Sequence, residues 1–319
     1  MTAIGKLAIG QARHRWRLPA SRWARREAVE GYLLASPWLL GFLVFTLGPF
    51  LAALYFSFTE YNVFTPPHWV GIRNYISLVQ EKLFPISLYN TAFYTALSVP
   101  LSLLGSLLIA LLLRDDFTGI RFFRTSFYVP AVTSGVAAAM LWAMILDPNL
   151  GLINQALDAI GIRGPGWLTD PDWAKPSLVL MDLWYVGGGQ AVIFLAGLKG
   201  ISASLYEAAE IDGAGRWSLL RYVTLPMITP SVFFNLIIGI IGSFQVFTKA
   251  YVMTQGGPLN ATYFYMLWLY EKAFLHAHMG SACAAAYILF LIVLVLTLIQ
   301  FRLASTWVYY ETSITAVRR

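Results

Sequence analysis

Six long apolar blocks constrain this sequence more than any other feature. Each has the length of a membrane-spanning helix, which needs about 20 apolar residues to cross about 30 Å of hydrocarbon. Charged residues make up only 12% of the chain and hydrophobic residues 58%, whereas about a quarter of a soluble domain is charged. The sequence therefore predicts an all-α membrane protein with six transmembrane helices. These cover approximately residues 32–58, 88–113, 125–146, 177–198, 232–253 and 281–303.

The first block could be mistaken for a signal peptide, because Arg22, Arg25 and Arg26 precede it. Its apolar run, however, is longer than the roughly 7–15 residues of a signal-peptide core. No small-residue cleavage site follows before Thr59. We therefore expect this block to be retained as a membrane anchor.

The distribution of Lys and Arg between the loops predicts the orientation. Segments 1–31, 114–124, 199–231 and 302–319, which share one side of the membrane, hold 16 of the 22 basic residues. The opposite loops hold 5, and Lys249 lies inside the fifth block. Because positively charged loops stay in the cytoplasm, we expect both termini to be cytoplasmic and the chain to cross the inner or plasma membrane several times.

The chain lacks the motifs of an enzyme or of a nucleic-acid-binding protein. Its net charge of +6 arises from the loops that flank the membrane, so no nucleic-acid partner is expected. It has no G-x-x-x-x-G-K-[ST] segment that could hold nucleotide phosphates. Its single cysteine, Cys283, excludes an intramolecular disulfide, and His276 and His278 have a poor spacing for joint metal ligation on a helix. We expect no catalytic residue, metal or cofactor in this chain.

The long outer loop between the third and fourth blocks contains a helical pattern. Apolar residues between Leu152 and Ile160 fall on one helical face, and Gly161, Gly164, Pro165 and Gly166 follow. This pattern predicts a short helix at the outer membrane interface. Such a helix could receive a partner protein or could cap the helical bundle.

The inner loop between the fourth and fifth blocks has the pattern of two short helices. Residues 204–226 read SLYEAAEIDGAGRWSLLRYVTLP. We expect Ser204 and Glu207 to form a capping box that begins the first helix. Gly213 can adopt the left-handed conformation that ends it, and a second helix runs from Arg216 to Pro226. The loop would protrude from the membrane on the side where ATP is available.

This loop resembles the E-A-A–x3–G segment of the inner-membrane subunits of binding-protein-dependent ABC importers. The pattern E-A-A-x-x-D-G-A followed by L-P-x-x-x-P, which ends at Pro230, is similar to the carbohydrate branch, the maltose and glycerol-3-phosphate type. The outer segment TQGGPLNAT at 254–262 and the GYLL segment before Pro37 match that branch too. The likeness covers about residues 25–311 and implies the type I ABC importer permease fold.

The resemblance implies a division of labour between subunits. In this family the loop is a coupling helix that sits in a cleft of a separate ATPase, where the glutamate of E-A-A pairs with a basic residue. That role falls to Glu207, with Ala208, Ala209 and Gly213 as packing and turn positions and Asp212 as a supporting acid. Two ATPase subunits, which bind ATP and Mg, a second homologous permease subunit and an extracytoplasmic substrate-binding protein are the implied partners. The alternative is that these acids only solubilise an inner loop.

The fifth block has one small or polar face. At about 100° per residue, a narrow stripe lies opposite a face rich in Ile and Phe. The stripe contains Asn235, Gly239, Gly242, Val246 and Lys249, with Ser243 and Gln245 at its edges. It indicates either close helix packing or a water-accessible cavity in which these polar groups satisfy sugar hydroxyls. Lys249, near the outer end, could snorkel to the interface.

Three consecutive glycines at 187–189 interrupt the fourth block. Each glycine costs about 1 kcal/mol relative to alanine in a helix interior, so we expect a break or a close backbone approach at membrane depth, as at many transport sites. The resemblance implies sugar contacts here and on the next span. The candidate substrate-pathway residues are Trp184, Val186, Gly189, Gln190, Asn235, Gly239, Gly242, Ser243, Gln245 and Val246. Several polar contacts expected from the relatives are absent, which indicates a remodelled site or a different specificity.

The sequence thus predicts a permease subunit of an ATP-driven, binding-protein-dependent sugar or oligosaccharide importer that works by alternating access. One alternative is an importer of glycerol-3-phosphate or its diesters. Another is a stand-alone secondary transporter, but Asp182 is the one acid inside a predicted span. The expected organisation is a basic cytoplasmic segment at 1–31, a first transmembrane helix at 32–58, a permease core at 87–303 and a cytoplasmic tail at 304–319.

Overall fold

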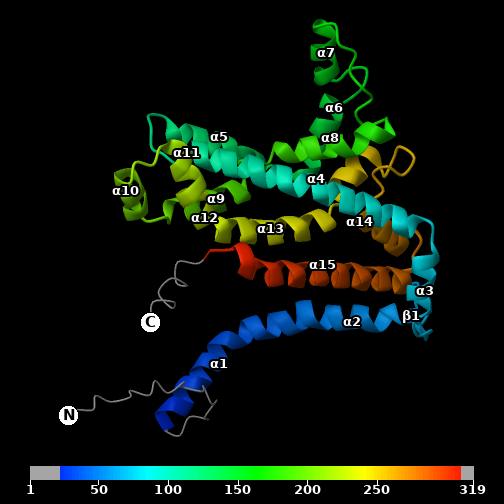
Figure 1. Ribbon diagram of the computed structural model, residues 1–319. Coiled ribbons are helices and arrows are strands. Elements are labelled where there is room, and N and C mark those ends of the chain that lie inside the picture. The colour runs from blue at the N-terminus through cyan, green and yellow to red at the C-terminus, as the bar shows by residue number, and fades with distance from the viewer. Residues whose placement is uncertain (1–21, 310–319) are drawn as a thin grey trace. The chain divides into compact units, whose positions relative to one another are not determined.

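The computed structural model describes residues 22–309, which are almost entirely helical (Figure 1). Residues 1–21 and 310–319, parts of the expected basic segment and tail, lie outside the described residues. The chain divides into two compact units, residues 1–55 and 56–319. In the first unit, α1 (Arg22–Phe42) continues through a π-helical turn (Leu43–Leu47) into α2 (Gly48–Ser57). This corresponds to the first predicted span.

The second unit begins with a short antiparallel hairpin. It consists of β1 (Thr59–Glu60) and β2 (His68–Trp69), with Thr59 opposite Trp69, and is followed by α3 (Arg73–Gln80). Asn74 of α3 connects this helix to the start of the hairpin. Its buried Nδ2 donates to the carbonyl oxygens of Ser57 at 2.9 Å and Thr59 at 2.8 Å. The side-chain amide thus replaces ladder hydrogen bonds that so short a hairpin lacks.

The long helices α4 (Leu83–Leu112) and α15 (Met279–Trp307) run through the second unit. Together with the segment Arg25–Ser57 they are the three helices, within residues 22–309, that are long and apolar enough to cross a membrane unbroken. Three further pairs of helices pass the same test only if each bent pair counts as one span. The described chain is therefore compatible with up to six crossings.

The third predicted span is not one helix. It forms α5 (Ile120–Val132) and α6 (Gly135–Ile145), which meet at 97°. Pro130 lacks the N–H that would continue the α-helical hydrogen-bond ladder, and Thr133 and Ser134 adopt extended backbone conformations. The expectation of a continuous helix over 125–146 is therefore wrong, since the apolar composition continues through a backbone break.

The fourth span is broken at its glycines, as the sequence predicts. Helix α8 (Pro171–Leu183) ends just before Trp184, and α9 (Gly189–Lys199) begins at the third glycine. Gly187 lies so close to α5 that an added Cβ would be 2.3 Å from the carbonyl oxygen of Phe127. Both the break and the close backbone approach are confirmed.

This contact makes Gly187 sensitive to substitution. Gly187→Ala is expected to lower the stability of the folded chain by about 1–3 kcal/mol, because the backbone of α5 must move. Gly189→Ala is the matched control, since nothing lies within 4 Å of its added Cβ. Thermal unfolding in detergent checks the difference, and equal midpoints for the two variants would contradict it.

The inner loop forms the two predicted helices, but they begin and end at other residues than expected. Helix α10 (Ala203–Ile211) has Ser202, not Ser204, as its N-cap, and no side chain caps its first turn. The predicted capping box is therefore wrong, because the helix begins earlier and places Leu205 at the position that Glu207 would need. Gly213 has φ +83°, and the N–H groups of Gly213 and Ala214 donate to the carbonyl oxygens of Glu210 and Ala209. The predicted left-handed glycine cap is confirmed.

The second inner helix continues past Pro226. It runs through α11 (Arg216–Leu219), a π-helical turn (Leu220–Thr224) and α12 (Leu225–Met227), and bends by 59° into α13 (Thr229–Phe244). In the π-helical turn the N–H of Leu225 donates to the carbonyl oxygen of Leu220. This wider turn accommodates a proline without ending the helix, so the end predicted at Pro226 is one residue early.

The fifth span also ends sooner than predicted. Its helix stops at Phe244, and a π-helical turn (Ala250–Thr254) follows after an irregular stretch. The Gly-Gly-Pro loop comes next and contains a cis Gly257–Pro258 bond. Helix α14 (Tyr265–Tyr270) and another π-helical turn (Glu271–Leu275) then lead to α15.

The outer loop contains the short helix that its pattern predicts, α7 (Leu152–Ala159). Buried Asn154 fixes it, donating to the carbonyl oxygen of Pro148 at 2.9 Å and accepting from the indole N–H of Trp167 at 2.6 Å. Just before α7, the N–H groups of Leu150 and Asn149 donate to the carboxylate of Asp147 and lower its pKa. The hydrogen bonds of Asn154 and Asp147 thus fix the conformation of this loop.

The largest hydrophobic cluster lies where α14 meets α4, α8 and α15. Trp268, Tyr94 and Tyr265 are its largest fully buried side chains. The Tyr265 hydroxyl donates to the carbonyl oxygen of Ala285 at 2.8 Å, and its backbone N–H donates to Thr91 Oγ1 at 2.9 Å. Helix α14 is thereby pinned between the two long helices. A second, smaller cluster around Phe194 and Leu198 joins α4 to α9.

Candidate substrate cavity and coupling segment

A cavity of about 520 Å³ lies among α4, α13 and the broken fourth span. Helix α4 contributes Tyr94, Ser98, Val99 and Ser102 to its wall. Tyr185, Val186 and Gly189, at the glycine break that separates α8 from α9, also line it. The cavity therefore forms at an interrupted helix, where backbone polar groups are free to face a bound molecule.

Seven of the ten candidate pathway residues line this cavity. They are Val186, Gly189, Gln190, Gly239, Gly242, Ser243 and Val246. Trp184, Asn235 and Gln245 are not in its wall. Trp184 packs edge-to-face on Trp142, with ring centroids 6.3 Å apart, and Gln245 lies just beyond the end of α13. Beyond Phe244 the wall includes Val246 and Lys249 of the predicted stripe and also Phe247 and Thr248, which lie outside it.

Asn235 supports the cavity from behind. It is fully buried, and its Nδ2 donates to the carbonyl oxygen of Gln190 at 3.3 Å. The Gln190 side chain in turn accepts from Ser106 Oγ at 3.3 Å, and an added Cβ on Gly239 would lie 3.5 Å from its Nε2. Asn235 thus donates to the backbone at the start of α9, and its Oδ1 has no hydrogen-bond partner among the described residues.

An ion pair that the sequence analysis missed lines the cavity. Lys249 pairs with Asp182, and the Tyr94 hydroxyl donates to the same carboxylate. Ser98 Oγ donates to Asp182 at 3.0 Å, and Lys249 Nζ donates to the Tyr94 oxygen at 2.9 Å. Lys249 therefore does not snorkel but is paired within the protein, with a side chain 20% exposed. The sequence did contain a signal for this pair, because the fourth apolar block holds one acid and the fifth holds one base. Charges inside a membrane commonly pair with each other.

Helix α10 carries the candidate coupling residues on an exposed surface. Glu207 and Ala208 are exposed, Ala209 is half-buried, and Asp212 and Gly213 are exposed in the turn that follows. Within residues 22–309, the side chain of Glu207 has no hydrogen bond or ion pair.

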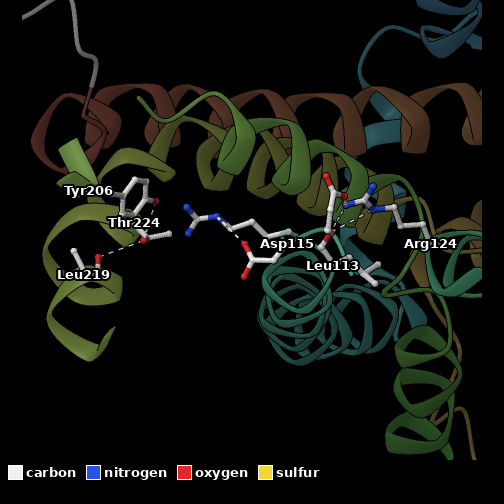
Figure 2. A network of polar contacts seen from close by, with 8 residues as sticks. Leu113, Asp115, Arg124, Tyr206, Leu219 and Thr224 are labelled. Carbon is white, nitrogen blue, oxygen red and sulfur yellow. Dashed lines mark hydrogen bonds and ion pairs between the residues drawn. The ribbon is translucent and has the colours of Figure 1, made fainter. Parts of the chain in front are cut away.

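A second cavity, of about 780 Å³, lies beside α10. Its wall includes Glu207 and Glu210 and the basic residues Arg114, Lys199 and Arg216. Figure 2 shows one part of its surroundings, where Tyr206 and Thr224 face each other and Arg124 reaches Leu113. Within the second unit, α10 and α11 lie at the opposite end from α3 and β1 (Figure 1). The two cavities are thus separate features of one helical unit.

No group of three or more His, Cys, Asp or Glu side chains that could hold a metal occurs among the described residues.

Comparison with known proteins identifies the family. Residues 87–307 match the family described as "Binding-protein-dependent transport system inner membrane component". The probable ABC transporter permease protein YesP of Bacillus subtilis is 41% identical over 298 residues, which cover 92% of this chain and 96% of YesP. The lactose transport system permease protein LacF of Rhizobium radiobacter is 34% identical, covering 86% of this chain and 93% of LacF.

A relative named for another substrate and a chain of known structure are also similar to this chain. The sn-glycerol-3-phosphate transport system permease protein UgpA of Yersinia pestis is 34% identical, covering 88% of this chain and 95% of UgpA. A chain of a bacterial ABC transporter involved in the import of the acidic polysaccharide alginate matches with a TM-score of 0.78 and 25% identity, covering 88% of this chain and 96% of that one. The chain therefore has the type I ABC permease fold and belongs to the family of binding-protein-dependent transport system inner membrane components.

Proposed function

We propose that this chain is the membrane permease subunit of an ATP-driven sugar importer and moves its substrate by alternating access. The observation that carries the proposal is the cavity at the broken fourth span, with the exposed motif helix α10 elsewhere on the same unit. The lactose permease relative and the relative described as a probable starch degradation products permease support sugar as the substrate class. Oligosaccharides are included, because the wall combines hydroxyl and amide groups with apolar side chains, as sugar sites require.

The second part of the proposal concerns energy. The chain contains no nucleotide-binding motif, so ATP and Mg bind to two partner ATPase subunits, and this chain is not itself an enzyme. Glu207 receives the ATPase, with Ala208 and Ala209 as a flat contact surface and Gly213 and Asp212 as the turn beside it. The exposed carboxylate of Glu207, without a partner in the described chain, supports this role.

The third part concerns partners and placement. A second, homologous permease subunit completes the pathway, because one coupling helix per chain must match two ATPases. A substrate-binding protein delivers the sugar at the outer face, as the family description implies. The chain crosses the inner or plasma membrane six times with both termini in the cytoplasm, which the 16 to 5 distribution of loop Lys and Arg supports.

The charge of the cavity wall favours a sugar over glycerol-3-phosphate as the substrate. Glycerol-3-phosphate is the substrate for which the UgpA relatives are named. The charged residues in the cavity wall are Asp182 and Lys249, which neutralise each other. A phosphate in a water-excluded site requires uncompensated cationic contacts. Any uncompensated cationic contact to a phosphate would therefore have to come from the second permease subunit, because the cavity wall of this chain offers none.

Reconstitution tests the proposal. The chain is purified with its ATPase and second permease subunits and its binding protein, and is placed in proteoliposomes that contain ATP on the ATPase side. Uptake of labelled lactose, maltotriose, sn-glycerol-3-phosphate and an alginate trisaccharide is compared. We expect ATP-dependent and binding-protein-dependent uptake of a sugar. Uptake of glycerol-3-phosphate alone, or of none of the four, would contradict the proposed substrate class.

A further inference from the structure

The side chains of α10 make few connections to the rest of the unit. None of its residues is fully buried, and Ile211 at its end is 86% exposed. Among the described residues, the hydrogen bonds and ring contacts from α10 side chains to other elements all belong to Tyr206. A force applied to α10 therefore has, besides the two backbone connections and any apolar packing, the polar and ring contacts of this one side chain by which to reach the other helices.

Tyr206 contacts two different elements. Its ring lies under the guanidinium of Arg114, with Cζ 4.5 Å from the ring centroid, which is within cation–π range. Its hydroxyl hydrogen-bonds Thr224 Oγ1 at 3.1 Å, and Thr224 Oγ1 also contacts the carbonyl oxygen of Leu219 at 3.3 Å (Figure 2). Thr224 is buried and Tyr206 is half-buried, and both line the second cavity.

Both contacts lead to helices that line the substrate cavity. Arg114 lies two residues after the end of α4, and α4 carries Ser98 and Ser102 in the cavity wall. Thr224 immediately precedes α12, which leads into α13 with Gly239 and Gly242 in the wall. Tyr206 thus bridges the exposed motif helix to the inner ends of two cavity helices.

The loop that holds Arg114 is itself anchored. Arg124 on α5 donates to the carbonyl oxygen of Leu113 at 2.8 Å and pairs with Asp116 at 2.9 Å. Arg114 and Asp115 approach at 3.9 Å. Displacement of Arg114 by Tyr206 would therefore move a loop tied to both α4 and α5, rather than a free side chain.

We propose that Tyr206 is the positioning residue that transmits movement of α10 to α4 and α13. The proposal rests on the proposed function, in which a partner ATPase moves α10. Its ring pushes on Arg114 and its hydroxyl on Thr224, so that one displacement acts on both sides of the cavity. Such a link is a coupling between two sites carried by packed and hydrogen-bonded groups.

A cavity-accessibility measurement tests the link and needs no identified substrate. Cys283 is replaced by serine, and Ser102→Cys places a reporter thiol in the cavity wall. The complex with its ATPase and second permease subunits is treated with a maleimide in the presence and absence of Mg–ATP, and the ATP hydrolysis rate is measured in parallel. The reporter complex with Tyr206 intact should change its labelling rate with Mg–ATP.

Tyr206→Leu should reduce this ATP-dependent change by about fivefold or more, while hydrolysis stays within about twofold. Tyr206→Phe, which keeps the ring over Arg114, should retain part of it. Thr224→Val also removes the hydrogen bond to Leu219 and should lose at least as much as Tyr206→Phe. The double variant should be no worse than Thr224→Val alone, because both single changes break the same Tyr206–Thr224 hydrogen bond. Tyr222→Leu is the matched control, since that tyrosine is 71% exposed in the same loop.

The outcomes separate this proposal from the function it rests on. An unchanged ATP response in Tyr206→Leu would overturn the link alone. Loss of hydrolysis together with the response would also overturn it, because Tyr206 would then serve assembly rather than transmission. Absence of any ATP response in the reporter complex with Tyr206 intact would instead count against ATP-driven alternating access.

Discussion

Glu207→Lys is expected to abolish uptake while the chain still inserts into the membrane. The carboxylate is exposed on α10 without a partner among the described residues, which suits a charge reserved for another subunit. In the proposed function, reversing it would place a lysine against the basic residue that the family resemblance implies on the ATPase. Losing one partner of a buried ion pair costs about 3–5 kcal/mol, which corresponds to a loss of about 100-fold or more in docking affinity.

Two readouts check this expectation. ATPase subunits that co-purify with the tagged chain report docking, and ATP-dependent uptake in proteoliposomes reports function. Glu210→Lys makes the same change of charge one turn further along α10 and should retain more of both activities. If the two variants behaved alike, the charge of the loop rather than the position of Glu207 would matter. Wild-type uptake in Glu207→Lys would refute the coupling role.

Lys249→Met is expected to destabilise the chain by about 3–5 kcal/mol, because it leaves the Asp182 carboxylate unpaired in a largely buried site. The pair joins the fourth span to the segment after α13, and Tyr94 and Ser98 add α4 to the same network. Its loss would therefore loosen three cavity walls together. The thermal unfolding midpoint in detergent measures the effect.

Two double variants separate charge from contact. Asp182→Asn with Lys249→Met removes both charges and should recover most of the lost stability, because no uncompensated charge remains. The exchange Asp182→Lys with Lys249→Asp restores the ion pair with its direction reversed. Stability equal to the natural chain in Lys249→Met alone would show that the carboxylate finds another partner. A double variant no more stable than Lys249→Met would show that the pair acts through shape rather than charge.

Local features of the fold could be predicted because they depend on local chemistry. Three adjacent glycines weaken any helix, and α8 and α9 are separated there. Gly213 follows a short helical pattern and has the left-handed conformation that ends α10. The apolar pattern before Gly161 forms α7. The capping box failed because Ser202 offered an earlier start of similar chemistry, which a single sequence cannot rank.

The residues that line the cavity could be predicted in part. Seven of the ten pathway residues meet in one cavity, because small residues and glycine breaks mark where helices approach or open. Asn235 and Gln245 lie outside the cavity wall. Gln245 follows the end of α13 at Phe244, where a projection at constant angle no longer applies, whereas Asn235 lies within α13 and donates to the backbone of Gln190. Tyr94 and Ser98 were missed altogether, because they lie in a block whose polar residues gave no reason to single them out.

By itself, the sequence determined the class of protein, the approximate positions of the apolar segments and the motif helix with its glycine turn. These follow from bilayer thickness and from backbone preferences, which act over a few residues. Only the tertiary structure decided that Lys249 pairs with Asp182, that the third span bends by 97° and that Tyr206 bridges Arg114 and Thr224. Each of these depends on groups far apart in the chain, which come together only when the helices pack.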